Sequence, residues 1–131
     1  MTEPKWLTIR MVRLMHARAA AFFGGSRDIR DEALIQDALD RPRNAYAHGE
    51  EPSPFAIAAA CCAGIVKYHP FIDGNKRTGL LAARAFLFRN GYLLEPEEAD
   101  EVNTIVALAA GEVDEDMLAQ WLADNSEPKE T

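Results

Sequence analysis

The sequence predicts an all-α protein, a bundle of about six helices. Apolar residues recur at helical spacing along most of the chain, and no segment shows the alternation typical of a half-buried strand. Apolar residues make up 48% of the 131 positions, which is enough for one hydrophobic core and too many for a disordered chain. Two apolar segments, 55–68 and 75–90, are the candidates for the centre of the bundle.

Two helices are expected in the first third of the chain. Thr8 can cap the first helix, and Gly24-Gly25 can end it. The second helix is expected over residues 31–39, and we expect Pro42 to stop it because a proline inside a helix removes one hydrogen bond. The segment 43–54 contains glycine and two prolines, which predicts a long loop.

The central pair of helices has clear start and stop residues. Ser53-Pro54 offers a capping side chain followed by a proline in the first turn. The helix over residues 55–68 should end before Pro70, because the residue preceding a proline disfavours helical geometry. The next helix, residues 75–90, is expected to end at Gly91, which suits a left-handed cap.

The C-terminal part is expected to add two more helices. A short extended link at residues 92–94 leads to helices over residues 96–110 and 114–123. We predict a single domain covering residues 1–125, followed by a disordered tail at residues 126–131.

Charge is distributed unevenly along the chain. The net charge is −7, but residues 95–131 hold 12 acidic and 1 basic side chains, whereas residues 1–94 hold 13 basic and 9 acidic ones. The overall negative charge argues against direct binding to nucleic acid. The more positive N-terminal part can still attract a small anion.

The sequence indicates a cytoplasmic protein without a membrane segment. No signal peptide is recognisable, and no apolar run reaches the roughly 18 residues needed to span a bilayer. The cysteines, Cys61 and Cys62, are adjacent, and neighbouring side chains on a helix point in different directions. We therefore expect small buried residues of a reducing compartment and not a disulfide or a metal pair.

The most informative segment lies at residues 69–77, between the two central helices. His69 ends the first of them, and an imidazole titrates close to neutral pH, so it can accept a proton there. Asp73 offers a hard oxygen ligand, which suits Mg²⁺ when substrate phosphates complete its coordination.

The helix start that follows has the features of an anion site. Gly74 lets backbone amides approach an anion closely, and Asn75 can cap the helix and orient a phosphate oxygen. Lys76 and Arg77 place positive charge at the positive end of the helix dipole, which is unfavourable unless an anion binds. Each residue alone can be explained as a cap, a turn or a solvated cation. Their combination between two buried helices indicates a polyphosphate site.

Residues 69–77 resemble the signature of the Fic/Doc superfamily, most closely that of its death-on-curing (Doc) branch, the Doc-type toxins of toxin–antitoxin modules. The resemblance extends over residues 7–123 and includes residues 42–46 and 108–112. It implies an α-helical fold with the motif between two central helices and an ATP–Mg²⁺ site at the motif.

Two positions relate the chain to the Doc branch and not to typical Fic proteins. Fic proteins that transfer AMP have a glycine where this chain has Lys76 and a second arginine where it has Leu80. Doc-type toxins share the lysine and resemble kinases, since they phosphorylate a threonine of translation elongation factor Tu. Lys67 and Leu81 stand where Doc has an arginine and an asparagine.

The resemblance implies a role for each residue of the site. His69 is expected to take the proton from the target hydroxyl, and Asp73 to hold Mg²⁺. The groups expected to bind the phosphates of ATP come from both central helices: Gly74, Asn75, Lys76, Arg77 and Lys67. The chain has no match to the inhibitory helix of Fic proteins, which implies control by a Phd-like antitoxin that binds a surface groove.

Two connections are candidates for further contacts. Segment 43–54 is a candidate flap that docks the protein target through Tyr46, His48 and Gly49; the alternative is a mobile surface loop. The connection at residues 26–30 is expected to be ordered by polar contacts with the site. We expect His16 at the surface of the first helix and His48 in a loop, neither as a metal ligand.

Two other functions stay open at this point. An AMP transferase acting on a protein hydroxyl would use the same nucleotide site. A non-catalytic binding protein would keep only the fold and bind a partner helix.

Overall fold

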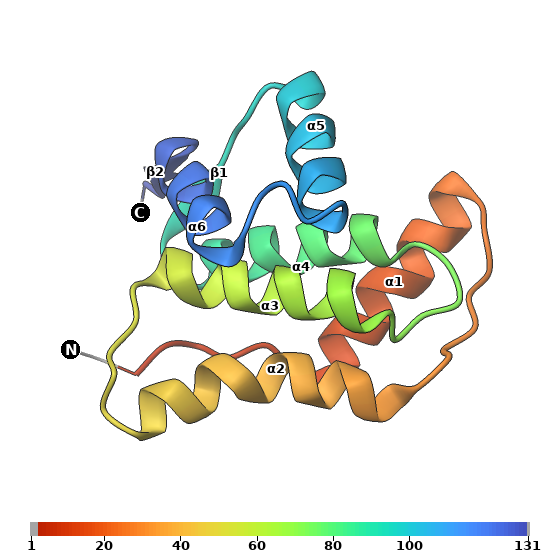
Figure 1. Ribbon diagram of the computed structural model, residues 1–131, viewed down its shortest axis with the longest axis horizontal. Coiled ribbons are helices and arrows are strands. Elements are labelled where there is room, and N and C mark those ends of the chain that lie inside the picture. The colour runs from red at the N-terminus through yellow and green to blue at the C-terminus, as the bar shows by residue number, and fades with distance from the viewer. Residues whose placement is uncertain (1–2, 131) are drawn as a thin grey trace.

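The computed structural model describes residues 3–130, which form six α-helices and one two-stranded sheet (Figure 1). In chain order the elements are α1 (Ile9–Phe23), α2 (Glu32–Ala47), α3 (Pro54–Tyr68), α4 (Asn75–Arg89), β1 (Tyr92–Leu94), α5 (Glu98–Ala109), α6 (Glu115–Asp124) and β2 (Ser126–Pro128). The prediction of an all-α protein is confirmed. None of the helices within residues 3–130 is long and apolar enough to cross a membrane.

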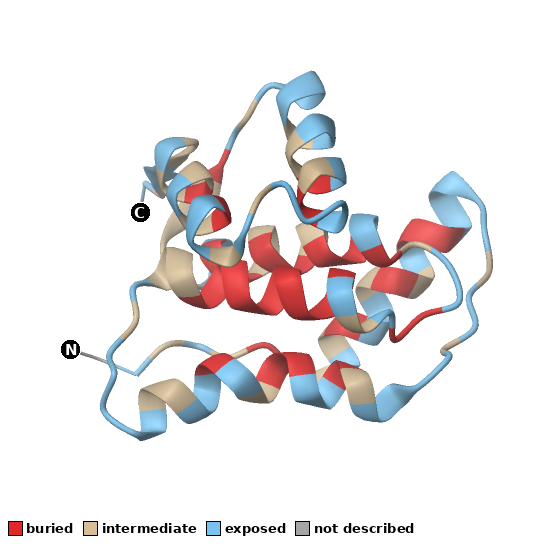
Figure 2. Ribbon diagram, viewed as in Figure 1, coloured by how far each residue is buried: buried red, intermediate tan, exposed pale blue. Residues whose placement is uncertain are grey.

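Helix α3 is the centre of the bundle. Its residues 57–66 are all buried, and it packs against α2, α4 and α6 (Figure 2). Small side chains allow close approach, since a Cβ added at Gly64 would lie 2.7 Å from the Cβ of Ala38 on α2. Dense packing of this kind makes the positions of the helix ends rigid.

The adjacent thiols of Cys61 and Cys62 are buried in α3, as predicted. Burial raises the pKa of Cys61 to about 12, and it also raises the pKa of Cys62. Both side chains therefore stay protonated and act as small apolar groups.

Several predicted helix boundaries are confirmed by capping contacts. The side chain of Thr8 accepts a hydrogen bond from the backbone N–H of Met11 at 3.2 Å, and that of Ser53 from Ala56 at 3.1 Å. These bonds satisfy N–H groups that have no partner inside the helix.

The predicted end of the second helix is wrong. Helix α2 continues through Pro42 to Ala47, although a proline in a helix interior costs about 3 kcal/mol. Pro42 is buried, and the turn after it packs on Trp6, whose ring centroid lies 5.6 Å from that of Tyr46. Tertiary packing with this distant residue thus keeps the last turn helical.

The predicted disordered tail is also wrong for Ser126–Pro128. These residues form β2, which pairs antiparallel with β1 in the register Tyr92 to Pro128. The backbone N–H of Lys129 extends the pairing by donating to the carbonyl of Gly91 at 2.7 Å. Strands of three residues are too short to show alternation in a sequence.

Candidate functional site

The predicted site lies in the loop at residues 69–74, which joins the end of α3 to the start of α4 (Figure 1). The two helices pack against each other along their length. The loop therefore connects two rigid ends of the core, and its residues are held at one edge of the bundle.

His69 occupies a strained backbone conformation at the C-cap of α3. Its φ of 53° and ψ of 55° lie in the left-handed region, which a residue with a side chain adopts only when the surroundings impose it. Arg30 imposes it here: its Nε donates to the carbonyl of His69 and its Nη2 to the carbonyl of Tyr68, both at 2.7 Å. The guanidinium thus also neutralises the negative end of α3.

Further backbone contacts connect the segment before α2 to the motif loop. The N–H groups of Arg30 and Asp31 donate to the carbonyl of Pro70 at 2.7 and 2.9 Å, and the N–H of Ile72 donates to Asp28 at 3.2 Å. The expected ordering of residues 26–30 by polar contacts is confirmed. The individual role of Arg30 was not predicted, because nothing near it in the sequence indicates that it reaches α3.

The side chain of Asn75 lies inside the loop. Its Oδ1 accepts from the backbone N–H of Phe71 at 3.0 Å, and its Nδ2 donates to the carbonyl of Phe71 at 2.9 Å and to Nδ1 of His69 at 3.2 Å. It is 6% exposed. The side-chain amide of Asn75, which was expected to orient a phosphate oxygen, is therefore occupied by contacts within the loop. The backbone N–H of Asn75 remains available to bind an anion.

His16 was expected at the surface of the first helix, and this prediction is wrong. It is 3% exposed, and its Nε2 lies 2.7 Å from the carbonyl oxygen of Asp73. Its ring stacks on Phe71 at 3.8 Å. Its spacing from Val12 and Ala19, which are both buried, places it on the inner face of α1, and this periodicity could have revealed it.

Asp73 presents an exposed carboxylate at the mouth of the loop. Its Oδ1 accepts from the N–H of Gly74 at 2.9 Å, and its Oδ2 lies against Gly25, where an added Cβ would come within 2.4 Å. Within residues 3–130 there is no group of three His, Cys, Asp or Glu side chains that could hold a metal. A single carboxylate fits Mg²⁺, which takes further oxygen ligands from phosphates and water.

The start of α4 has the character of an anion site. Gly74 is its N-cap with a φ of 81°, and no side chain caps the helix. Lys76 and Arg77 are exposed in the first turn, which holds no acidic residue, and Arg77 lies 4.4 Å from the ring centre of Phe23.

Two polar side chains flank this helix start. Lys67 is exposed in the last turn of α3, and in the part of the chain that the structure describes no ion pair involves it, Lys76 or Arg77. The buried Oγ1 of Thr78 has no hydrogen-bond partner among the described residues. Uncompensated cations and free helix N–H groups favour a bound polyphosphate.

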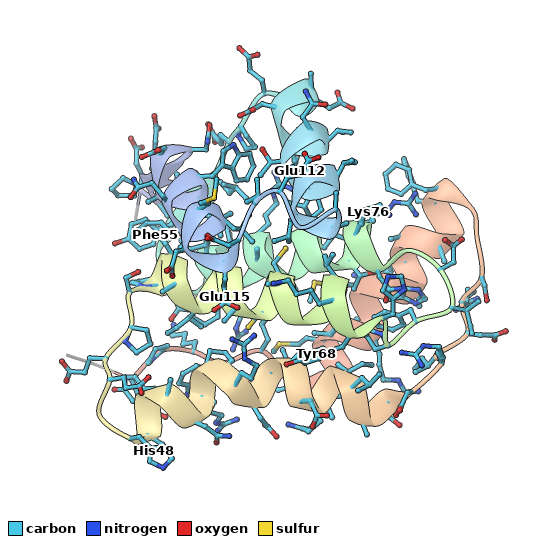
Figure 3. The ribbon with its side chains drawn as sticks, viewed as in Figure 1. His48, Phe55, Tyr68, Lys76, Glu112 and Glu115 are labelled. Atoms are coloured by element: carbon cyan, nitrogen blue, oxygen red, sulfur yellow. The ribbon has the colours of Figure 1, made fainter. Side chains whose placement is uncertain are left out.

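The three residues of the candidate flap are not brought to the site. Tyr46 is in the last turn of α2, and His48 and Gly49 follow it, at the end of the bundle where α3 begins. Helix α3 separates them from the motif by about 22 Å of helical rise. His48 and Lys76 accordingly lie at opposite ends of the molecule in Figure 3. His48 is exposed, with Nδ1 2.7 Å from the carbonyl of Asn44.

Comparisons with known proteins show which family the chain resembles. Residues 6–87 match the Fic/DOC family. The chain is 34% identical over 104 residues to Toxin Doc of Mycolicibacterium smegmatis, with 77% of this chain and 80% of the relative covered. It is 30% identical over 110 residues to Protein kinase doc of Escherichia phage P1, with 82% and 85% covered. A Fido domain-containing protein of Dictyostelium discoideum is 37% identical over 73 residues, with 53% and 51% covered.

The chain therefore belongs to the Fic/DOC family, in its death-on-curing (Doc) branch. The bundle of six helices, with the motif loop between α3 and α4, is the fold that the resemblance implied.

Proposed function

We propose that this chain is a Doc-type toxin that transfers the terminal phosphate of ATP to a hydroxyl group of a protein in the cytoplasm. The observation that carries the proposal is that one rigid loop brings three groups together. They are the exposed His69, the carboxylate of Asp73 and the cationic first turn of α4. Phosphoryl transfer through a loose transition state requires positioning and charge neutralisation more than covalent chemistry.

The chain's own groups divide this work. Lys76, Arg77 and the free N–H groups of α4 bind the phosphates, with Lys67 close by on α3. His69 contacts the target hydroxyl. Mg²⁺ held by Asp73 would neutralise charge on the phosphates.

Transfer of phosphate, and not of AMP, is supported by two side chains. Lys76 occupies the position that is glycine in AMP-transferring Fic proteins, and the half-buried Leu80 occupies that of their second arginine. A relative of similar length is named Protein kinase doc, which agrees with this choice.

The proposed target is elongation factor Tu, whose modification would arrest translation, and the proposed regulator is a Phd-like antitoxin. The resemblance to Doc-type toxins implies both, and the similarity to Toxin Doc and Protein kinase doc supports a module with an antitoxin. A surface groove of about 790 Å³ between α1 and the start of α2 supports the antitoxin proposal. Arg10, Arg13, Arg27 and Glu32 line it. Glu32 pairs with Arg13 at 3.0 Å, so Arg10 and Arg27 are the cations that favour an acidic segment.

The test is transfer of label to purified elongation factor Tu in the presence of Mg²⁺. With ATP labelled at the γ phosphate we expect a labelled protein, and with ATP labelled at the α phosphate none. Label from the α position alone would establish AMP transfer instead.

A matched pair of histidine variants assigns the activity to the loop. His69→Ala should lower transfer by at least about 100-fold, because it removes the group that contacts the hydroxyl. His48→Ala changes an exposed histidine at the other end of the bundle and should transfer normally. A fully active His69→Ala variant contradicts the proposal.

A further inference from the structure

The inference concerns His16 on α1 and the peptide unit between Asp73 and Gly74 in the motif loop. Helix α1 passes beside this loop (Figure 1), and Nε2 of His16 lies 2.7 Å from the carbonyl oxygen of Asp73. A carbonyl oxygen can only accept a hydrogen bond, so Nε2–H is the donor. A flipped ring would place a carbon atom there, and 2.7 Å is much shorter than the roughly 3.3–3.6 Å of a C–H···O contact.

The orientation of the His16 ring is fixed by contacts of the ring itself. It stacks on the buried ring of Phe71, with centroids 3.8 Å apart and planes inclined by 9°. It also lies against Gly74, where an added Cβ would be 3.6 Å from both Cδ2 and Nε2 of the imidazole. A buried ring held by close packing on two residues of the loop cannot rotate freely.

The peptide unit that His16 contacts has two polar groups that point in opposite directions. The peptide bonds within residues 3–130 are all trans, and in a planar trans peptide the C=O and the N–H lie on opposite sides. The carbonyl of Asp73 points to α1, so the N–H of Gly74 points away from α1. There it donates to Oδ1 of Asp73 at 2.9 Å. The hydrogen bond from α1 thus decides on which side the Gly74 N–H and the Asp73 carboxylate meet.

The residue types of the loop would allow this peptide unit to turn over. Glycine adopts positive and negative φ about equally readily, so Gly74 tolerates either orientation of the peptide unit that precedes it. After such a turn the carbonyl oxygen would stand where the N–H now stands. The carboxylate of Asp73 would lose its donor and would face a second oxygen, which repels it.

We infer that His16 is a positioning residue for the proposed reaction: its Nε2–H keeps the peptide unit between Asp73 and Gly74 in one orientation, and this places the Asp73 carboxylate for Mg²⁺ and the phosphates. The inference rests on the proposed function. His16 acts only through the loop, because its ring is buried and touches neither the nucleotide nor the target. In the alternative, the ring only fills space against Phe71.

Two substitutions separate the hydrogen bond from the packing of the ring. His16→Gln keeps an N–H donor but loses the aromatic ring, whereas His16→Phe keeps a ring that can stack on Phe71 but has no donor. The positioning role predicts that His16→Gln is the better enzyme, and a packing role predicts the reverse. His48→Phe makes the same change at an exposed histidine at the other end of the bundle and is the control.

The KM values and the nucleotide affinity measure the effect. His16→Phe should raise the KM for Mg²⁺–ATP by about tenfold or more, as expected when a metal ligand loses the residue that orients it. The KM for the protein target should stay at the wild-type value. Calorimetric titration with Mg²⁺–ADP, without any target protein, should show the same weakening in His16→Phe and most of the wild-type affinity in His16→Gln. Wild-type affinity in His16→Phe overturns the inference.

Crystal structures of the variants without nucleotide test the peptide orientation independently of activity. In His16→Gln the carbonyl of Asp73 should still point to α1, whereas in His16→Phe the peptide unit should turn and the carboxylate should move. An unchanged peptide unit in His16→Phe overturns the inference. If His16→Phe does not fold, His16→Leu, which also lacks a donor and has a smaller side chain, provides the same comparison.

The wild-type chain gives a further test. Long-range ¹H–¹⁵N correlation spectra of the ¹⁵N-labelled full chain show which ring nitrogens carry a proton, and the His16 signals are assigned by their loss in His16→Gln. We expect a proton on Nε2, and an Nε2 without a proton overturns the inference. Failure of the wild-type protein to transfer γ label would instead reject the proposed function, while the structures and spectra would still decide whether His16 orients the peptide unit.

Discussion

Two neighbouring glycines at the end of α1 have the same backbone requirement but different surroundings. Gly24 and Gly25 have φ values of 91° and 100°, where a side chain causes strain. An added Cβ at Gly24 would have no atom within 4 Å, whereas one at Gly25 would lie 2.4 Å from Oδ2 of Asp73. Gly25 therefore provides the space in which the carboxylate lies.

This difference predicts different effects of alanine at the two positions. Both variants should lose similar stability, about 1–2 kcal/mol, from the left-handed backbone. Gly25→Ala should also displace the Asp73 carboxylate and raise the Mg²⁺ concentration needed for phosphate transfer by about tenfold or more. Titration of transfer with Mg²⁺ checks this, with Gly24→Ala as the control. Equal Mg²⁺ dependence in the two variants would show that Asp73 does not hold the metal.

The residues of the site differ in how far they could be predicted from the sequence. His69, Asp73, Gly74, Lys76 and Arg77 fall within nine positions, so their chemistry was visible as a combination. His16 and Arg30 come from other segments and meet the loop only in the folded chain. A contact over 57 positions, such as that of His16 with Asp73, leaves no local pattern.

At the level of elements, the C-terminus of α3 depends on one exposed side chain. Arg30 replaces the missing helical partners of two carbonyls, those of Tyr68 and His69, and both bonds are short and charge-assisted. The same residue thus ends a helix and supports the strained backbone of His69.

Arg30→Ala should therefore affect stability and activity together. We expect a loss of about 1–3 kcal/mol in the free energy of unfolding, because two carbonyls lose a charged donor. Phosphate transfer should fall as well, because the His69 ring loses its fixed position. Urea denaturation and the transfer assay measure the two effects.

Two variants serve as controls for Arg30→Ala. Arg27→Ala lies in the same connection and removes no bond to either carbonyl, so it should behave like the wild type. Arg30→Lys can reach one carbonyl and should be intermediate. If Arg30→Ala has the same free energy of unfolding and the same transfer rate as Arg27→Ala, the last turn of α3 does not need this contact.

The elements themselves were predictable where a local signal defines them. Helices α1 and α3 begin at capping residues that the sequence displays, Thr8 and Ser53. The end of α2 was missed because packing on Trp6 outweighs the local effect of Pro42. Local propensity is a weak guide wherever tertiary contacts oppose it.

At the scale of the whole molecule, the small sheet connects the C-terminal segment to the core helices. Even the closest paired residues of β1 and β2, Leu94 and Ser126, are 32 positions apart in the sequence. Lys129 adds to the pairing, since its Nζ donates to the carbonyl of Phe88 at 3.1 Å and lies 3.9 Å from the ring centre of that residue. The segment predicted to be a tail is thus part of the folded unit.

A chain ending after Asn125 should be less stable than the full chain. It loses the pairing of β1 with β2 and the contacts of Lys129 with Gly91 and Phe88, and net values near 1 kcal/mol per hydrogen bond predict a loss of about 2–3 kcal/mol. The midpoint of thermal unfolding should fall by roughly 5–15 °C. A chain ending after Lys129 keeps every one of these contacts and should unfold at the midpoint of the full chain. If both truncated chains unfold at the same temperature, β2 adds nothing to the stability of the bundle. The motif loop lies at the other end of α4 from Gly91 and the sheet, so a truncated chain that remains folded should still transfer phosphate.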